Sequence, residues 1–179
     1  KYFNGFEWKD IAGSSTGNGI SKTPGASSHP SIAFRGGGGQ NIYGAFADFG
    51  FIAVAWDDNS SGDYEIYLRV FNGTDWQEIK ESGQMGGISR SLGQDTYPSV
   101  GWVNVYQTII AAPDLIHSVP VVLWQQDRTG ASDVVSAFFW PGDSLDDKIG
   151  WYSLGNVSST FARSSDRPKL VMDRYGRPF

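Results

Sequence analysis

The stretch Trp56–Gly73, WDDNSSGDYEIYLRVFNG, predicts two strands joined by a short polar turn. Residues 51–56 are apolar and suit a buried strand, whereas residues 64–71 alternate between two faces with a period of two. Residues 57–63 are Asp, Asn, Ser and Gly, which bond to nearby backbone or permit positive φ. The pattern is that of a β-hairpin whose second strand has one buried face.

The same pattern recurs along the chain. Phe3-Asn4-Gly5 returns as Phe71-Asn72-Gly73, and Trp8 returns as Trp76, both after 68 residues. Further matches at this offset are Gly19-Ile20-Ser21 with Gly87-Ile88-Ser89, Pro30-Ser31-Ile32 with Pro98-Ser99-Val100, and Trp56 with Trp124. A third, looser copy contains Phe139, Asn156-Val157-Ser158 and Pro168-Lys169-Leu170. Matches at one offset predict an internal structural repeat.

Each repeat is expected to contain four strands. In the first repeat they are 31–34, 51–56, 64–71 and 76–79, and in the second 99–103, 119–124, 133–139 and 149–154. Four antiparallel strands at a fixed period are typical of β-propeller blades. We therefore predict an all-β fold of β-propeller-type four-stranded antiparallel blades, with about two and a half repeats and an incomplete ring.

The repeat also sets the expected boundaries. Residues 1–29 would be the end of a preceding blade and a linker, 30–97 and 98–167 two blade repeats, and 168–179 the start of a third blade. Because the chain begins and ends within a repeat, we expect a mature or trimmed piece of a longer protein. Unpaired strand edges favour partners, which we expect to be further blades or copies of the same chain joined head to tail.

A resemblance supports this interpretation. Residues 54–76, VAWDDNSSGDYEIYLRVFNGTDW, followed by Gly86-Gly87-Ile88-Ser89 and Tyr97-Pro98-Ser99-Val100, resemble repeats of large exported bacterial and archaeal β-propeller surface proteins. Those repeats combine a strand ending in Ala-Trp, a polar Gly turn, a Glu-Ile-Tyr strand and an Asn-Gly-x-x-Trp turn. The resemblance implies a propeller fold and a secreted or cell-surface location. The Ser-x-Asp-x-Gly-x-x-Trp box of sialidases does not occur.

Composition limits the classes of partner. The net charge is −5, the pI is about 4.9 and no basic cluster occurs, which argues against nucleic-acid binding. No apolar run reaches the ~18 residues of a membrane-spanning helix. Cysteine is absent, so disulfides are not part of the fold.

The turn after Trp56 has a second interpretation as a calcium loop. Asp57, Asn59, Ser61 and Glu65 space oxygen ligands along a tight loop, and hard oxygen ligands suit Ca²⁺. The spacing resembles the calcium loops of integrin propeller blades. The alternative is a plain hairpin turn in which Asp57 and Asn59 bond to backbone. We therefore expect no cofactor to be required, and Ca²⁺ is the one that this loop could bind.

Two further sets of residues are candidates for surface roles. The long connections after residues 34 and 103 are rich in apolar residues and would cover partner surfaces. The candidate interaction residues there are Tyr43, Phe46, Phe49, Ile109 and Ile110. Asn-x-Ser/Thr sequons make Asn59, Asn72 and Asn156 candidate glycosylation sites.

Catalysis has little support. The two histidines, His29 and His117, have no partner at a nucleophile spacing, and acidic residues recur with the repeat as structural residues do. Trp56 and Trp124 are predicted core residues. We expect a non-catalytic structural or adhesive β-propeller repeat module of an exported cell-surface or extracellular protein. The alternatives are a lectin-like propeller, whose aromatic residues between blades bind a glycan, and a glycosidase-type propeller enzyme.

Overall fold

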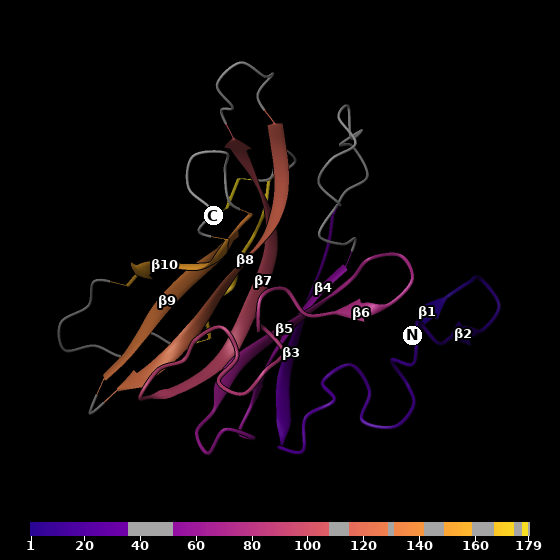
Figure 1. Cartoon of the computed structure of the whole chain (residues 1–179), viewed down its shortest axis with the longest axis horizontal. Coiled ribbons are helices and arrows are strands. Elements are labelled where there is room, and N and C mark those ends of the chain that lie inside the picture. The colour runs from indigo at the N-terminus through magenta and orange to yellow at the C-terminus, as the bar shows by residue number, and fades with distance from the viewer. Residues whose placement is uncertain are drawn as a thin grey trace.

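The chain is all-β in the parts that the computed structural model describes. These are residues 1–35, 52–107, 115–128, 131–141, 149–158, 167–173 and 177–178. They form no helix and three separate antiparallel sheets, none of which is closed (Figure 1). No helical segment in these ranges is long and apolar enough to cross a membrane.

Two of the sheets have four strands each, in chain order. The first sheet comprises β3 (Ser27–Phe34), β4 (Ile52–Asp58), β5 (Glu65–Phe71) and β6 (Trp76–Gln77). The second sheet comprises β7 (Gln94–Gln107), β8 (Leu115–Arg128), β9 (Ala131–Trp140) and β10 (Gly150–Asn156). Every predicted strand overlaps an observed one, so the prediction of two four-stranded antiparallel units is confirmed.

The third sheet is a small hairpin of β1 (Tyr2–Phe3) and β2 (Trp8–Lys9). Its turn has the same chemistry as the turn between β5 and β6. Asn72 Oδ1 accepts hydrogen bonds from two backbone N–H groups that follow it, both at 2.9 Å, and Asn4 Oδ1 does the same at 3.0 and 2.9 Å. Gly73 and Gly5 follow with φ of 103° and 99°, which glycine adopts without strain.

A cross-strand aromatic pair marks a matching position in all three sheets. The pairs are Phe3 with Trp8, Phe71 with Trp76 and Phe139 with Trp151. Their ring centroids are 5.5, 5.5 and 5.8 Å apart. Such pairs stabilise neighbouring strands beyond the area that they bury.

The first strand of each four-stranded sheet contains a bulge at an X-Pro step. The register of β3 shifts at His29-Pro30 and that of β7 shifts at Tyr97-Pro98. His29 and Tyr97 have φ of 44° and 53°. A bulge accommodates a proline within a strand, because the unpaired residue needs no N–H donor.

The main hydrophobic core lies between the two four-stranded sheets and contains residues of both. β3, β4 and β5 all contact β7 across it. A smaller core on the other face of the first sheet contains Trp56, Tyr67 and Trp76, against which Ile11 and Ile20 pack. The prediction that the second hairpin strand has only one buried face is therefore wrong, because residues 11–20 cover its second face. Trp56 and Trp124 are each 3 % exposed, which confirms that they are core residues.

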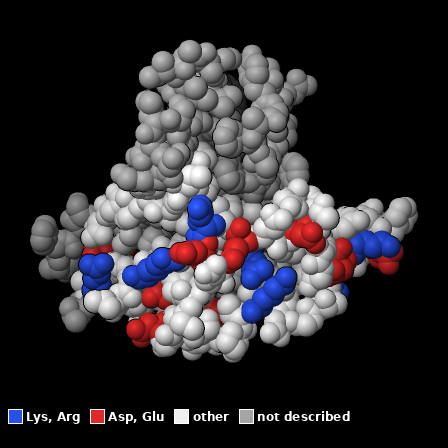
Figure 2. Space-filling view, in the orientation of Figure 1, with Lys and Arg blue, Asp and Glu red and all other residues white. Residues whose placement is uncertain are grey.

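The β1–β2 hairpin and the second sheet lie at opposite ends of the molecule's longest dimension, with the first sheet between them (Figure 1). On the face shown in Figure 2, acidic and basic side chains lie beside one another. This face therefore presents no broad field of one sign.

Candidate functional site: the seam between the two sheets

The outer loop, residues 78–91, follows β6 and continues the pairing of β5 beyond the end of β6. The Ile88 N–H donates to the Ile66 carbonyl at 2.7 Å, and the Ile66 N–H donates to Ser89 Oγ at 2.9 Å. Gly87, with φ of 52°, allows this approach, because a Cβ there would lie 2.0 Å from the Ile66 carbonyl oxygen.

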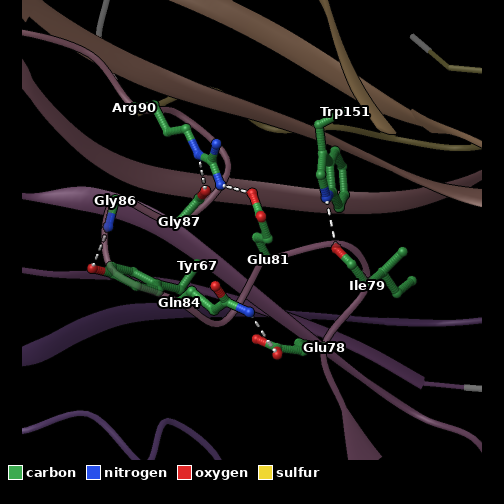
Figure 3. A network of polar contacts seen from close by, with 9 residues as sticks. All are labelled: Tyr67, Glu78, Ile79, Glu81, Gln84, Gly86, Gly87, Arg90 and Trp151. Carbon is green, nitrogen blue, oxygen red and sulfur yellow. Dashed lines mark hydrogen bonds and ion pairs between the residues drawn. The ribbon is translucent and has the colours of Figure 1, made fainter. Parts of the chain in front are cut away.

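Polar contacts hold the outer loop in shape (Figure 3). The Gly86 N–H donates to the Tyr67 hydroxyl at 3.3 Å. The Arg90 guanidinium donates to the Gly87 carbonyl at 3.3 Å and forms an ion pair with Glu81. The loop is thus fixed both to the first sheet and to itself.

The second sheet binds the outer loop through an indole. Trp151 Nε1, from β10, donates to the Ile79 carbonyl at 3.0 Å (Figure 3). The same contact occurs on the other side of the first sheet, where Trp76 Nε1 donates to the Ile11 carbonyl at 2.9 Å. Each acceptor lies three residues after the matching tryptophan of the neighbouring sheet, which is Trp76 for Ile79 and Trp8 for Ile11.

A side chain of β4 and one of β8 each accept a backbone hydrogen bond from a residue that precedes a proline further along the chain. The Tyr97 N–H donates to Asp57 Oδ2 at 3.0 Å, and the Arg167 N–H donates to Gln125 Oε1 at 3.2 Å. Asp57 Oδ2 also lies 2.8 Å from His29 Nδ1. The rings of His29 and Tyr97 are 4.1 Å apart, and the Arg167 guanidinium lies over Tyr97 at 5.0 Å. Side chains of the first sheet, the second sheet and residues 167–173 therefore meet here.

Two serines make a second set of matching contacts. Ser31 Oγ accepts from the Val100 N–H at 3.1 Å, and Ser99 Oγ accepts from the Leu170 N–H at 2.8 Å. Residues 167–173 therefore lie against β7 as β7 lies against β3.

A groove of about 410 Å³ opens between the outer loop and the second sheet. Ser89 and Ser91 line it from the loop, Trp124 and Gln126 from β8, and Trp151 from β10. The lining combines indole rings with hydroxyl and amide groups, and Arg90 and Arg128 add positive charge.

One difference between the sheets accounts for the space above Trp124. In the first sheet Trp56 pairs with Tyr67, and the two rings stack with centroids 5.9 Å apart. In the second sheet Trp124 pairs with Val135, and both residues line the groove. The position that holds a phenol ring in one sheet holds only an isopropyl group in the other.

Two buried carboxyl groups lie next to the residues that line the groove. Glu65 is 4 % exposed and accepts from Ser89 Oγ and from the Ser91 N–H, whereas fully buried Asp95 accepts from Gln126 Nε2 at 3.0 Å. Burial, aided by the nearby Asp95 carboxylate, raises the pKa of Glu65 to about 7. Burial also raises the pKa of Asp95. The pair therefore retains bound proton close to neutral pH.

Asp95 has no carboxyl counterpart in the first sheet. Asp95 pairs with Gln126, whereas Ser27 pairs with Asp58 at the matching position. Burial opposes ionisation of Asp58, but hydroxyl donors that include Ser27 and Thr23, each at 2.6 Å, leave its pKa lowered. The carboxyl group of this pair thus lies on the second strand of the first sheet, as Asp58, but on the first strand of the second sheet, as Asp95. A comparison of the two sequence segments could have found this difference, which the sequence analysis did not use.

The four predicted calcium ligands do not converge. Asp57 pairs with Ile66 and Glu65 with Asp58, so Asp57 and Glu65 project from opposite faces of the first sheet. Asn59 Oδ1 accepts from the Ala26 N–H at 2.8 Å. Ser61 Oγ donates to the carbonyl of Asp63 at 3.1 Å. Within the described ranges no group of three or more His, Cys, Asp or Glu residues is arranged to hold a metal, and calcium binding stays a prediction.

The other predicted site residues are placed as follows. The interaction candidates Tyr43, Phe46, Phe49, Ile109 and Ile110 lie outside the described residues. Of the sequon residues, Asn59 and Asn72 are half-buried in turns, and Asn156 is exposed at the end of β10 with Nδ2 3.1 Å from Asp133 Oδ2.

No family model, curated protein or solved structure matches this chain. The function is therefore inferred from the contacts across the seam and from the surfaces beside it.

Proposed function

We propose that this chain is a non-catalytic structural or adhesive module of β-propeller type, whose four-stranded sheets are blades and which acts by contact. We place it in an exported protein, at the cell surface or secreted, on the basis of its resemblance to repeats of exported propeller proteins. Its partners are further blades or copies of the same chain.

The indole-to-carbonyl contact carries this proposal. It joins the second sheet to the first through Trp151 and the first sheet to residues 8–11 through Trp76, with the same acceptor spacing. In stacked-repeat proteins each unit buries its apolar face only against its neighbours, so matching contacts between successive units are expected. The matching serine contacts and bulges support the same interpretation.

The absence of catalysis is part of the proposal. Burial raises the pKa of both Glu65 and Asp95, as it does for many catalytic acids, but both side chains are shielded from solvent. A glycosidase needs carboxyl groups that reach the scissile bond. A structural role for this pair, as hydrogen-bond acceptors within the seam, requires no such access.

The groove favours a second candidate function, which is carbohydrate binding. Trp124 and Trp151 supply indole surface, and Ser89, Ser91 and Gln126 supply hydroxyl and amide groups in a space of about 410 Å³. Sugars are held by such combinations of apolar surface and a few placed polar groups. Trp124 itself is 3 % exposed, so a glycan would have to bind mainly against Trp151 and the outer loop.

Two assays on the same purified protein distinguish the contact module, the lectin and the glycosidase. The labelled chain is applied to a glycan array and, in parallel, to a panel of chromogenic glycosides. The proposal expects no glycan signal above that of a Trp151→Ala variant and no hydrolysis. Glycan binding that Trp151→Ala abolishes would replace the contact module with the lectin, and hydrolysis that Glu65→Gln abolishes would replace it with the enzyme.

A further inference from the structure

If the indole contact continued at the two ends of the molecule, Trp8 would be the next donor and the Leu154 carbonyl the next acceptor. Trp8 matches Trp76 and Trp151, and no acceptor for its Nε1 is found in the described part of the chain. Leu154 lies three residues after Trp151, as Ile79 lies three residues after Trp76. By this spacing the Leu154 carbonyl corresponds to the Ile79 acceptor, although Leu154 lies within β10 and Ile79 lies beyond the end of β6.

Both of these ends are apolar and exposed. At the hairpin end, Trp8 is 66 % exposed and Phe3 is 55 % exposed, although the matching Trp76 is 7 % exposed beneath residues 11–20. At the other end, Leu154 is 61 % exposed and Val157 is 59 % exposed.

Val157 is an exposed apolar residue whose counterpart in the outer loop, Ile88, is buried. Its N–H donates to the Val134 carbonyl as that of Ile88 donates to the Ile66 carbonyl. Ile88, however, is 8 % exposed because the second sheet covers it. Val157 thus occupies a position that a following sheet would bury.

We infer that a second copy of this chain docks head to tail on the first, with its Trp8 indole donating to the Leu154 carbonyl. This inference rests on the proposed function and names its partner. The docking would reproduce an interface that the molecule already contains, with Trp8 in the place of Trp151 and Leu154 and Val157 in the places of Ile79 and Ile88. Because the two ends differ, the contact is heterologous, so further copies add until the rotation closes a ring or a fibre grows.

Charge does not oppose this docking. In the hairpin Lys9 pairs with Glu7 at 2.8 Å, so the exposed aromatic surface has neutralised flanks. On the second sheet, Asp133 near Val157 accepts from the Asn156 amide at 3.1 Å. The charged groups named here thus each have a partner within their own end of the molecule.

Complementary variants test the inference. Trp8→Glu blocks the hairpin end, and Leu154→Glu blocks the opposite end. Leu92→Glu is the matched control, because Leu92 is a fully exposed apolar residue outside both ends. Sedimentation velocity is measured over a concentration series for the unmodified chain, for each variant, and for an equimolar mixture of the two end variants. Circular dichroism verifies that each variant keeps its β-sheet content.

The unmodified chain and Leu92→Glu are expected to associate as concentration rises through the micromolar range. Trp8→Glu and Leu154→Glu should each be monomeric alone, and their mixture should form a one-to-one dimer, because each supplies the end that the other lacks. Self-association of either end variant would overturn the head-to-tail contact, and so would a monomeric unmodified chain. A monomeric chain that binds no glycan and hydrolyses no glycoside would overturn this inference and leave the proposed contact function standing.

Discussion

The buried carboxyl pair makes the stability of this protein depend on pH at the scale of single residues. An unfolded glutamate loses its proton near its ordinary pKa of 4.5, whereas folded Glu65 keeps it to about 7. Between these values the folded state binds more protons than the unfolded state, so the free energy of unfolding falls as pH rises. The contribution is complete below pH 4.5 and lost above pH 7.

We therefore expect the free energy of unfolding in urea to decrease by on the order of 1–3 kcal/mol from pH 5 to pH 8. The control is Glu65→Gln, which keeps a hydrogen-bonding side chain without a titrating proton and should leave only the smaller dependence that Asp95 contributes. Asp58, whose pKa is lowered, contributes in the opposite sense and only at lower pH, as stability is lost when it becomes protonated. If the free energy of unfolding changed equally with pH in the unmodified chain and in Glu65→Gln, titration of Glu65 would not be the cause of the pH dependence.

At the scale of the elements, the Trp151 indole donates a hydrogen bond that joins β10 to the outer loop. Trp151→Phe keeps an aromatic ring beside Phe139 and removes the hydrogen bond to the Ile79 carbonyl. Because that carbonyl belongs to a residue only 6 % exposed, the loss should destabilise the fold by about 1 kcal/mol, measured by urea unfolding. Trp8→Phe makes the same chemical change at an exposed matching position. A loss equal to that of Trp8→Phe would show that the indole donor does not hold β10.

The strands themselves could be predicted, because the period-two alternation and the repeat mark them independently. The same pattern predicted that Trp56 and Trp124 are core residues. The calcium spacing does not by itself place its residues together, because β4 continues through Asp58 and strand pairing sends Asp57 and Glu65 to opposite faces, so calcium binding stays a prediction. Glu65 and Asp95 come from different sheets, and an interpretation that treats acidic residues as recurring structural residues does not bring them together.

At the scale of the whole molecule, the hairpin and the two sheets form a row in which each sheet donates an indole to the element before it, through Trp76 and Trp151. In the proposed docking, Trp8 is the donor at one end of this row and the Leu154 carbonyl is the acceptor at the other. Two independent sheets would not share a direction of this kind. Burial of the linking indoles, with Trp76 at 7 % exposed against Trp8 at 66 %, should therefore be measurable in solution.

Hydrogen exchange of the indole N–H groups, followed by NMR on the nitrogen-15-labelled chain, tests this most directly. The seven tryptophans each give one indole signal, and a Trp→Phe variant assigns each of the three that matter. In dilute solution we predict slow exchange for Trp76 and Trp151, which are hydrogen-bonded across the seams, and fast exchange for Trp8. As concentration rises, Trp8 should become protected as well. Fast exchange of Trp151, at a rate matching that of Trp8 in dilute solution, would contradict the account.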